Sequence, residues 1–587
     1  MGDYSVSDIY QGGYSSMSPI YGNIFGNYRV NPKSFGMTTD PRTANIIQDA
    51  STKLNVGAKH IEISAVQPDV FESIPDSHLL EMKRLSKLVG ATVSVHGPIL
   101  EPSGMSKDGF SETNREGVER QMLSAVKRAH IVSPDENIPV TFHSSVSVPD
   151  QITTKDKLPE ETYVVNRDTG SIHRVPLKER TFPGENTKRD IKEEINKINE
   201  QQWTESLRQL EYRSQIGGEA IERALGTELL AEAEKKAGKP LTKTMEDMNS
   251  TFNQGAIHIN SSYNELKELF DTAYHNASDV EKNKIEKFYK DVEERAKQLK
   301  ENPKEIQNTV IMRDIIQKGV NFLNKEIVAP KLYGSLNEFS KEKTVETISN
   351  VAFGSFKEFK DKSPIISIEN PPVGSAFSRG EDLKDIVEKA REKFVEKAIK
   401  PISEKGLGMS EAKAKEAAAK LIGVTWDVGH INMMRKYGYE SEDIIKETEK
   451  VAKLVKHVHL SDNFGFEHTE LPMGMGNVPM KEILNKLGKE GFDAKKIIEA
   501  GNWWQHFQSS PFKETLEAFG SPIYSMQMAP YWNQHLGLQQ GYYSGYGAML
   551  PQTNYASFGA GFSGLPMELG GQAPGAEGSR MSGKGME

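Results

Sequence analysis

The sequence places metal-binding side chains at the ends of short apolar runs. The four clearest are Glu369, Asp427, His459 and Glu499, each of which follows or ends a run typical of a β-strand. Three carboxylates repel one another too strongly to share a poorly solvated cleft without a cation. Carboxylate oxygens with one ring nitrogen suit manganese, magnesium, zinc or cobalt. Together these residues predict a divalent-metal site.

Two further histidines predict a second ion. His96 and His143 also follow β-branched runs, and the small residues after them allow tight turns and close approach to a bound group. If both imidazoles lie beside Glu369, that carboxylate can bridge two ions. Two ions about 3.5–4 Å apart can activate a water between them and stabilise a leaving oxygen.

A third group of polar residues follows the last strands. His430 lies three residues after Asp427, and His468 and Glu470 precede a glycine-rich loop. These three residues predict either a third metal site or a substrate-binding group, and the sequence leaves both open. His457 lies two positions before a predicted ligand, on the same strand face but one layer deeper, and is predicted to be a core or supporting residue.

Eight β-type segments must position these side chains. They lie near 34–38, 60–64, 92–96, 139–143, 364–369, 423–427, 456–460 and 496–500. Amphipathic helical segments separate them, for example 77–89 and 442–453. Repeated βα units with right-handed crossovers close into a barrel whose C-terminal face gathers the strand-end side chains. The predicted fold class is α/β, a (β/α)8 TIM barrel.

The barrel is predicted in two halves, at 31–150 and 361–515. Between strands four and five, residues 151–360 predict a large, mainly helical insertion with a short hairpin near 163–173 and long charged helices near 190–215 and 263–300. A structural cap, a substrate lid and a partner-binding arm are the alternatives for its role.

Both ends of the chain are low in complexity. Residues 1–30 and 516–587 are rich in Gly and Tyr, which predicts disordered tails. They are either flexible segments without a specific role or sites of self-association or partner binding through tyrosine.

Composition narrows the class of protein. The 587 residues include no Cys, which excludes disulfides and thiolate ligands, so a metal must sit on nitrogen and oxygen. A net charge of -9 argues against a whole-surface nucleic-acid binder but leaves room for a locally basic groove. No run approaches the roughly 18 apolar residues of a membrane span, and the first residues lack the features of a signal peptide. We therefore expect a cytoplasmic protein that does not contact membranes.

With these motifs the sequence resembles the xylose isomerase-like TIM-barrel superfamily, which includes endonuclease IV and sugar isomerases and epimerases. The resemblance covers about 31–150 and 361–510 and rests on segments 95–98, 368–370, 426–430, 457–462 and 498–499. It implies that the superfamily's shared ion is held by Glu369, Asp427, His459 and Glu499.

The resemblance to endonuclease IV adds two further sites. It implies a second zinc on Glu369, His96 and His143, and a third held by His430 and the segment around His468. Two features depart from that enzyme. Its Asp-x-His motif is replaced by the order His468-Thr469-Glu470, and its DNA-inserted aromatic residue is replaced by Ile99. Segment 458–477 is more similar to the sugar isomerase branch.

Two catalytic interpretations therefore compete. In the first, an endonuclease-IV-like hydrolase with two or three zinc ions cleaves a phosphodiester in DNA that carries abasic sites. In the second, one manganese, cobalt or magnesium ion binds a small sugar, and Glu369 and Glu499 exchange a proton with the carbon beside its carbonyl. We expect Asn370, His430 and Asp462 to contact the substrate. A third alternative is a non-catalytic barrel scaffold, and the tails and the insertion are candidates for self-association or protein binding.

Overall fold

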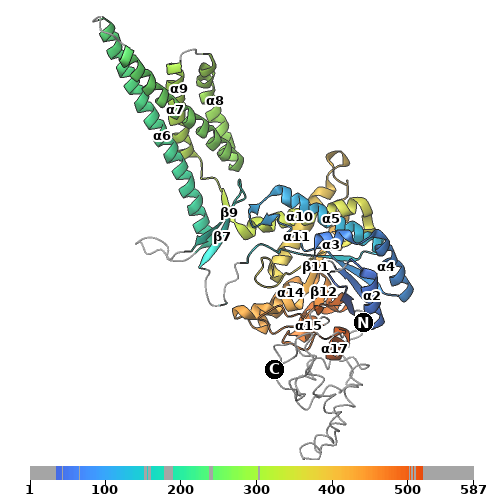
Figure 1. Cartoon of the computed structure of the whole chain (residues 1–587). Coiled ribbons are helices and arrows are strands. Elements are labelled where there is room, and N and C mark those ends of the chain that lie inside the picture. Colours follow the sequence, from blue (N-terminus) through green and yellow to red (C-terminus); the bar gives the residue numbers. More distant parts are fainter. Residues whose placement is uncertain are drawn as a thin grey trace, which may run out of the picture. The chain divides into compact units, whose positions relative to one another are not determined.

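The structure of the chain is a computed structural model (Figure 1). It describes residues 35–519 apart from 43, 65–66, 151–154, 156–159, 178–189, 237–241, 302–304, 502, 504–506 and 508–509. The predicted N-terminal tail and nearly all of the predicted C-terminal tail lie outside the described residues.

Eight parallel strands form a closed barrel, as predicted. In order around the barrel they are β1 (Phe35–Thr38), β13 (Lys495–Ile498), β12 (Val455–Leu460), β11 (Ile422–Asp427), β10 (Ile365–Glu369), β6 (Pro139–His143), β3 (Thr92–His96) and β2 (His60–Ser64). The first and last strands pair through Gly36 and Ile497, so the blue and orange ends of the colour scale meet in the barrel of Figure 1.

The strands are buried on both faces, which is typical of a parallel barrel. In β2, Ile61 and Ile63 alternate with Glu62, and all five residues of this strand are buried. Because consecutive side chains of a strand point to opposite faces, the isoleucines lie on one face and Glu62 on the other. Polar residues at these alternate positions therefore share one side of the barrel wall.

The helices of the barrel unit are amphipathic. They are α2 (Ile46–Asn55), α3 (Pro68–Ser73), α4 (Asp76–Val89), α5 (Glu112–Val132), α10 (Leu336–Phe359), α11 (Gly380–Ile399), α12 (Glu411–Leu421), α13 (Val428–Asn432), α14 (Ser441–Val451), α15 (Met480–Asp493) and α17 (Pro511–Ala518). In α11 the buried face includes Leu383, Ile386 and Phe394 at helical spacing. A small hairpin of β4 (Met105–Ser106) and β5 (Gly109–Phe110) precedes α5.

The chain divides into two compact units. One comprises Met1–Pro159 with Asn337–Glu587 and contains the barrel, and the other is Glu160–Leu336. The second unit, mainly helical as predicted, enters the chain between β6 and β10, the fourth and fifth barrel strands. Its boundaries are narrower than the 151–360 expected from the sequence, because α10 belongs to the barrel unit from Asn337 onward.

The second unit contains a three-stranded antiparallel sheet and four long helices. The sheet has the order β8 (Ile172–Pro176), β7 (Glu161–Asn166), β9 (Tyr333–Ser335), and the helices are α6 (Ile191–Lys236), α7 (Thr242–Asn276), α8 (Asp279–Glu301) and α9 (Glu305–Glu326). Buried side chains of these helices, among them Leu210, Ile259 and Leu323, form a core of their own. Gly217 and Gly255 let α6 and α7 approach closely, since a Cβ atom on Gly255 would lie 2.8 Å from the carbonyl oxygen of Gly217.

The prediction of one continuous helix at 263–300 is wrong. The structure has a break between α7, which ends at Asn276, and α8, which begins at Asp279. Ser278 starts the second helix, because its backbone N–H donates to Glu281 Oε2 at 2.9 Å and its own hydroxyl lies 3.4 Å from the Glu281 backbone N–H. This reciprocal pairing is a capping box. Among the described residues, no helix has the length and apolar character to cross a membrane.

Candidate metal centre

Glu369 is the central residue of the polar cluster at the strand ends. It is the last residue of β10, is fully buried, and pairs in register with His143 of β6. Its Oε2 atom lies 3.2 Å from Nε2 of His96 and 3.3 Å from Nε2 of His143. Two imidazoles from two different strands thus converge on one carboxylate oxygen.

The other oxygen of Glu369 faces a different set of groups. Its Oε1 atom lies 2.7 Å from Nδ1 of His459, which also lies 3.3 Å from Oε2 of Glu499. One ligand atom from each of Glu369, Asp427, His459 and Glu499 falls within 4.8 Å of all the others. The four residues that the sequence predicted to share an ion are therefore adjacent in the structure.

The charges in this cluster fit a cation. Asp427 is fully buried, and its Oδ2 atom is among the buried side-chain atoms without a hydrogen-bond partner in the described part of the chain. Burial, and then the neighbouring carboxylates of Glu499 and Glu369, raise the pKa of Asp427 well above its ordinary value. A divalent ion would offset this repulsion and occupy the free oxygen, so the residues present are suited to one.

The histidines around Glu369 differ in their protonation. Burial alone would raise the pKa of Glu369, but the imidazoles of His459 and His143 hold it well below its ordinary value. Burial opposes protonation of His96, yet its contact with Glu369 raises its pKa to about 9. Burial lowers the pKa of His143, which favours the neutral form that a metal ligand requires.

His430 and His468 come together beside the first cluster. Nδ1 of His430 donates to the carbonyl oxygen of Asn370 at 2.7 Å, so its Nε2 atom carries a lone pair. That atom lies 2.8 Å from Nε2 of His468, which is 3.7 Å from Oε1 of Glu470. Burial and the neighbouring His468 lower the pKa of His430 to about 3. The structure thus brings His430, His468 and Glu470 together, and the choice between a third metal site and a substrate-binding group stays a prediction.

The two other residues predicted to bind the substrate, Asn370 and Asp462, form hydrogen bonds with backbone groups. Asn370 donates to the carbonyl oxygen of Asp427 at 2.9 Å and accepts from its N–H at 2.8 Å, which fixes the end of β11. Asp462 is buried and accepts from the backbone N–H groups of Asn463, Gly474 and Val478 at 2.9–3.1 Å, which shapes the glycine-rich loop. Contact of either residue with a substrate stays a prediction.

Two supporting carboxylates were missed by the sequence analysis. Glu101 follows the loop of His96, and its Oε2 atom accepts from the backbone N–H groups of Val146 and Ser147 at 2.8 Å each, which ties this loop to the one after His143. Glu62 lies inside the barrel and contacts His459. A carboxylate flanked by isoleucines in a strand was the available signal for Glu62, whereas Glu101 has no sequence signature.

The comparisons with known proteins agree with this architecture. Residues 378–519 match the family described as xylose isomerase-like TIM barrel. This match covers the last three strands of the barrel, β11, β12 and β13. Glu369, His96 and His143 precede the match, whereas the other six predicted ligands lie within it: Asp427, His430, His459, His468, Glu470 and Glu499. The family match therefore does not include the three residues predicted to hold the second ion, and that ion stays a prediction.

The individual proteins that this chain is similar to are distant. An uncharacterized protein of Methanocaldococcus jannaschii is 31% identical over 110 residues, which span 19% of this chain and only 36% of the relative. Crystal structures of a D-tagatose 3-epimerase-like protein and of D-psicose 3-epimerase with D-tagatose from Clostridium cellulolyticum H10 share 13% and 9% identity. The TM-score is 0.36 for both structures. The match covers 83% of this chain and 99% of the first structure's chain, and 84% of this chain and 98% of the second structure's chain. Such values carry no argument about substrate.

Proposed function

We propose that the chain is a divalent-metal-dependent phosphodiester hydrolase with a multinuclear site. The observation that supports this most is the position of Glu369. Its Oε2 atom faces His96 and His143, while its Oε1 atom faces His459. A carboxylate between two separate nitrogen sets is suited to bridging two ions.

The residues fit zinc as the first choice, because their ligand atoms are imidazole nitrogens and carboxylate oxygens. Bound divalent ions would supply an activated water and stabilise the leaving oxygen of a phosphodiester. In this proposal Glu369, Asp427, His459 and Glu499 would hold the first ion, and Glu369 with the two histidines of β3 and β6 would hold the second. His430 and His468, with their Nε2 atoms 2.8 Å apart, are candidates for a third.

The proposed substrate is duplex DNA with abasic sites. Three cations would offset the negative charge of a phosphodiester, and the barrel residues here are the ones that matched endonuclease IV in the sequence.

A single-metal sugar isomerase or epimerase is the second candidate. The observation in its favour is that Glu369, Asp427, His459 and Glu499 form a complete ligand group without the two histidines of β3 and β6. In that case one manganese, cobalt or magnesium ion would hold the sugar oxygens, and the two glutamates would move the proton. A non-catalytic scaffold would leave these buried carboxylates unexplained.

A double substitution separates the two reactions. His96→Ala with His143→Ala should remove the second ion and leave the four-residue group intact. The matched control is His258→Ala with His275→Ala, because both of these histidines are exposed on the second unit. Zinc content, nicking of abasic-site duplex DNA and interconversion of a ketose panel are measured on the parent and both variants.

The hydrolase proposal expects two or three zinc ions in the parent, and a nicking rate that falls by several orders of magnitude in the first variant but not in the control. Absence of nicking by a fully metallated parent would contradict it. Ketose turnover that persists in the first variant would favour the isomerase instead.

A further inference from the structure

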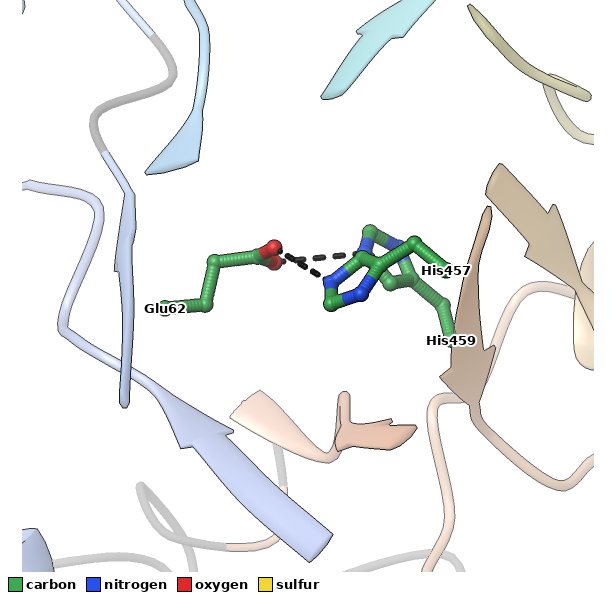
Figure 2. A group of neighbouring side chains, drawn as sticks. All are labelled: Glu62, His457 and His459. Atoms are coloured by element: carbon green, nitrogen blue, oxygen red, sulfur yellow. Dashed lines mark hydrogen bonds and ion pairs between the residues drawn. The ribbon is translucent and has the colours of Figure 1, made fainter. Parts of the chain in front are cut away.

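A second polar cluster lies directly beneath the candidate metal centre. Glu62 of β2 reaches across the barrel to His457 and His459 of β12, and all three side chains are fully buried (Figure 2). Oε2 of Glu62 accepts from Nε2 of His457 at 2.9 Å. Oε1 lies 3.2 Å from Nε2 of His459, within ion-pair distance, and in the described part of the chain neither of these two atoms has a hydrogen-bond partner. The metal centre does not use Glu62 as a ligand, so its buried charge needs a different explanation.

The two ring nitrogens of His459 face different carboxylates. Nδ1 faces Glu369 and Glu499, on the side of the candidate ion, whereas Nε2 faces Glu62. A neutral imidazole that offers a lone pair from one nitrogen carries its proton on the other. A ligand role for Nδ1 therefore requires a proton on Nε2, which is the nitrogen next to Glu62.

Glu62 is itself held in place. Ser94 of β3 donates its hydroxyl to Oε2 of Glu62 at 2.9 Å. The same hydroxyl lies 2.9 Å from Nε2 of His60, whose Nδ1 is 2.7 Å from the hydroxyl of Thr92. These contacts between β2 and β3 fix the carboxylate on its side of the barrel, so it can fix the ring opposite.

We propose that Glu62 is a positioning residue, which sets the tautomer and the ring orientation of His459 so that Nδ1 is presented to the ion. A cation placed among Glu62, His457 and His459 instead would take the Nε2 lone pair and force the proton onto Nδ1. That arrangement would remove His459 from the Glu369 group. The proposal rests on the four-residue metal site of the proposed function but on neither choice of reaction.

Glu62→Gln tests the role at nearly constant volume. The amide keeps one acceptor oxygen but no longer favours a proton on Nε2 of His459. Ser355→Ala is the matched control, because it removes a buried hydrogen bond of the barrel unit, between Ser355 of α10 and Ser363, and leaves the contacts of Glu62 with Ser94, His457 and His459 in place. Zinc affinity is measured by competition with a chelator, and the absorption spectrum of bound cobalt(II) reports the ligand geometry.

Loss of a carboxylate that orients a ligating histidine weakens metal binding by about 10–100-fold. We expect a loss of this size and an altered cobalt(II) spectrum in Glu62→Gln, and a change of less than about threefold in Ser355→Ala. Parent-like zinc affinity with an unchanged spectrum in Glu62→Gln overturns the proposal. Equal losses in both variants overturn it too, since they would show general loosening of the barrel.

The same measurements separate this proposal from the reaction. A parent that binds neither zinc nor cobalt(II) refutes the four-residue site and the role of Glu62 together. A parent that binds zinc but neither nicks DNA nor turns over ketoses contradicts the proposed reactions and leaves the role of Glu62 to be decided by the two variants.

Discussion

Asp427 offers a test in which stability and metal binding should change in opposite directions. Its Oδ1 atom accepts from the backbone N–H of His430 at 2.6 Å, while its buried Oδ2 atom has no hydrogen-bond partner in the described part of the chain. Asp427→Asn keeps the accepting oxygen, and asparagine is as good an N-cap residue as aspartate for α13. The substitution therefore removes the charge and replaces Oδ2 by an amide NH2 group, which can donate to the neighbouring carboxylates of Glu369 and Glu499.

The magnitude follows from the unpaired oxygen. A buried polar atom without a partner costs about 1–3 kcal/mol, and here two further carboxylates add repulsion. We expect metal-free Asp427→Asn to unfold at higher urea, with a free energy of unfolding about 1–3 kcal/mol above that of the parent. Zinc binding should weaken by more than the roughly 10–100-fold expected for an outer partner, because a ligand itself is lost.

The pH dependence gives the effect a signature. Burial, Glu499 and Glu369 raise the folded-state pKa of Asp427 above its ordinary value of 3.8. A carboxyl of this kind destabilises the folded chain as the pH rises from the unfolded pKa towards the folded one, because the folded state retains a proton that the unfolded state releases. The advantage of Asp427→Asn should thus vanish below about pH 4 and grow as the pH increases.

Urea unfolding with chelator, and again with zinc, measures both effects. Asp427→Ala is the control, since it also removes the charge but loses the cap, at a cost of about 1 kcal/mol. Metal-free Asp427→Asn that is less stable than the parent at pH 7, or that binds zinc as tightly, would refute the electrostatic account of this site.

Two further substitutions and one segment replacement test the packing of the barrel, the connection between the two histidine loops and the independence of the second unit. Gly97→Ala should cost about 1–3 kcal/mol in urea unfolding, because its Cβ atom would overlap the ring of Phe142 in the core; parent-like stability would contradict the packing. Glu101→Gln should lower zinc content towards one ion while the fold persists, since it weakens the tie between the two histidine loops, and a full zinc complement would exclude that role. Replacing 160–336 by a short Gly/Ser linker should leave a folded barrel by circular dichroism, whereas a deletion that also removes α10 should unfold it.

Much of the barrel was predictable because its signal is local. Most of the eight strands are short runs with β-branched residues that end near a turn, although β1 is Phe35-Gly36-Met37-Thr38, and helical spacing marks the segments between the strands. The ligand set was predictable for the same reason, since strand ends of a barrel meet on one face. Which oxygen of Glu369 faces which histidine was not predictable, because side-chain rotamers depend on neighbours distant in the sequence.

The elements missed by the sequence analysis lack a local signal. β9 is only three residues long, Tyr333–Ser335, and exists because it pairs with β7, which lies far away in the chain. The break before α8 depends on a reciprocal cap made by Ser278, which a charged helical pattern conceals. Glu62 contributes through a contact with β12 across the barrel, and strand periodicity indicates the face of a residue but not its partner.

The pairing of β7 with β9 bears on how this chain folds. β6 and β10 are neighbours in the barrel, with His143 in register with Glu369, yet the whole second unit separates them in the sequence. Contacts between such distant segments form slowly, because the intervening chain must lose entropy first. Val164 and Val165 of β7 pair with Ser335 and Gly334 of β9, which holds the two ends of the second unit within one strand spacing. Once that unit has assembled around its own core, the distance that the nascent barrel must close is short. The folded insertion would then hold the sequences on either side of it close together, so the fourth and fifth strands would pair as readily as strands that are close in the sequence.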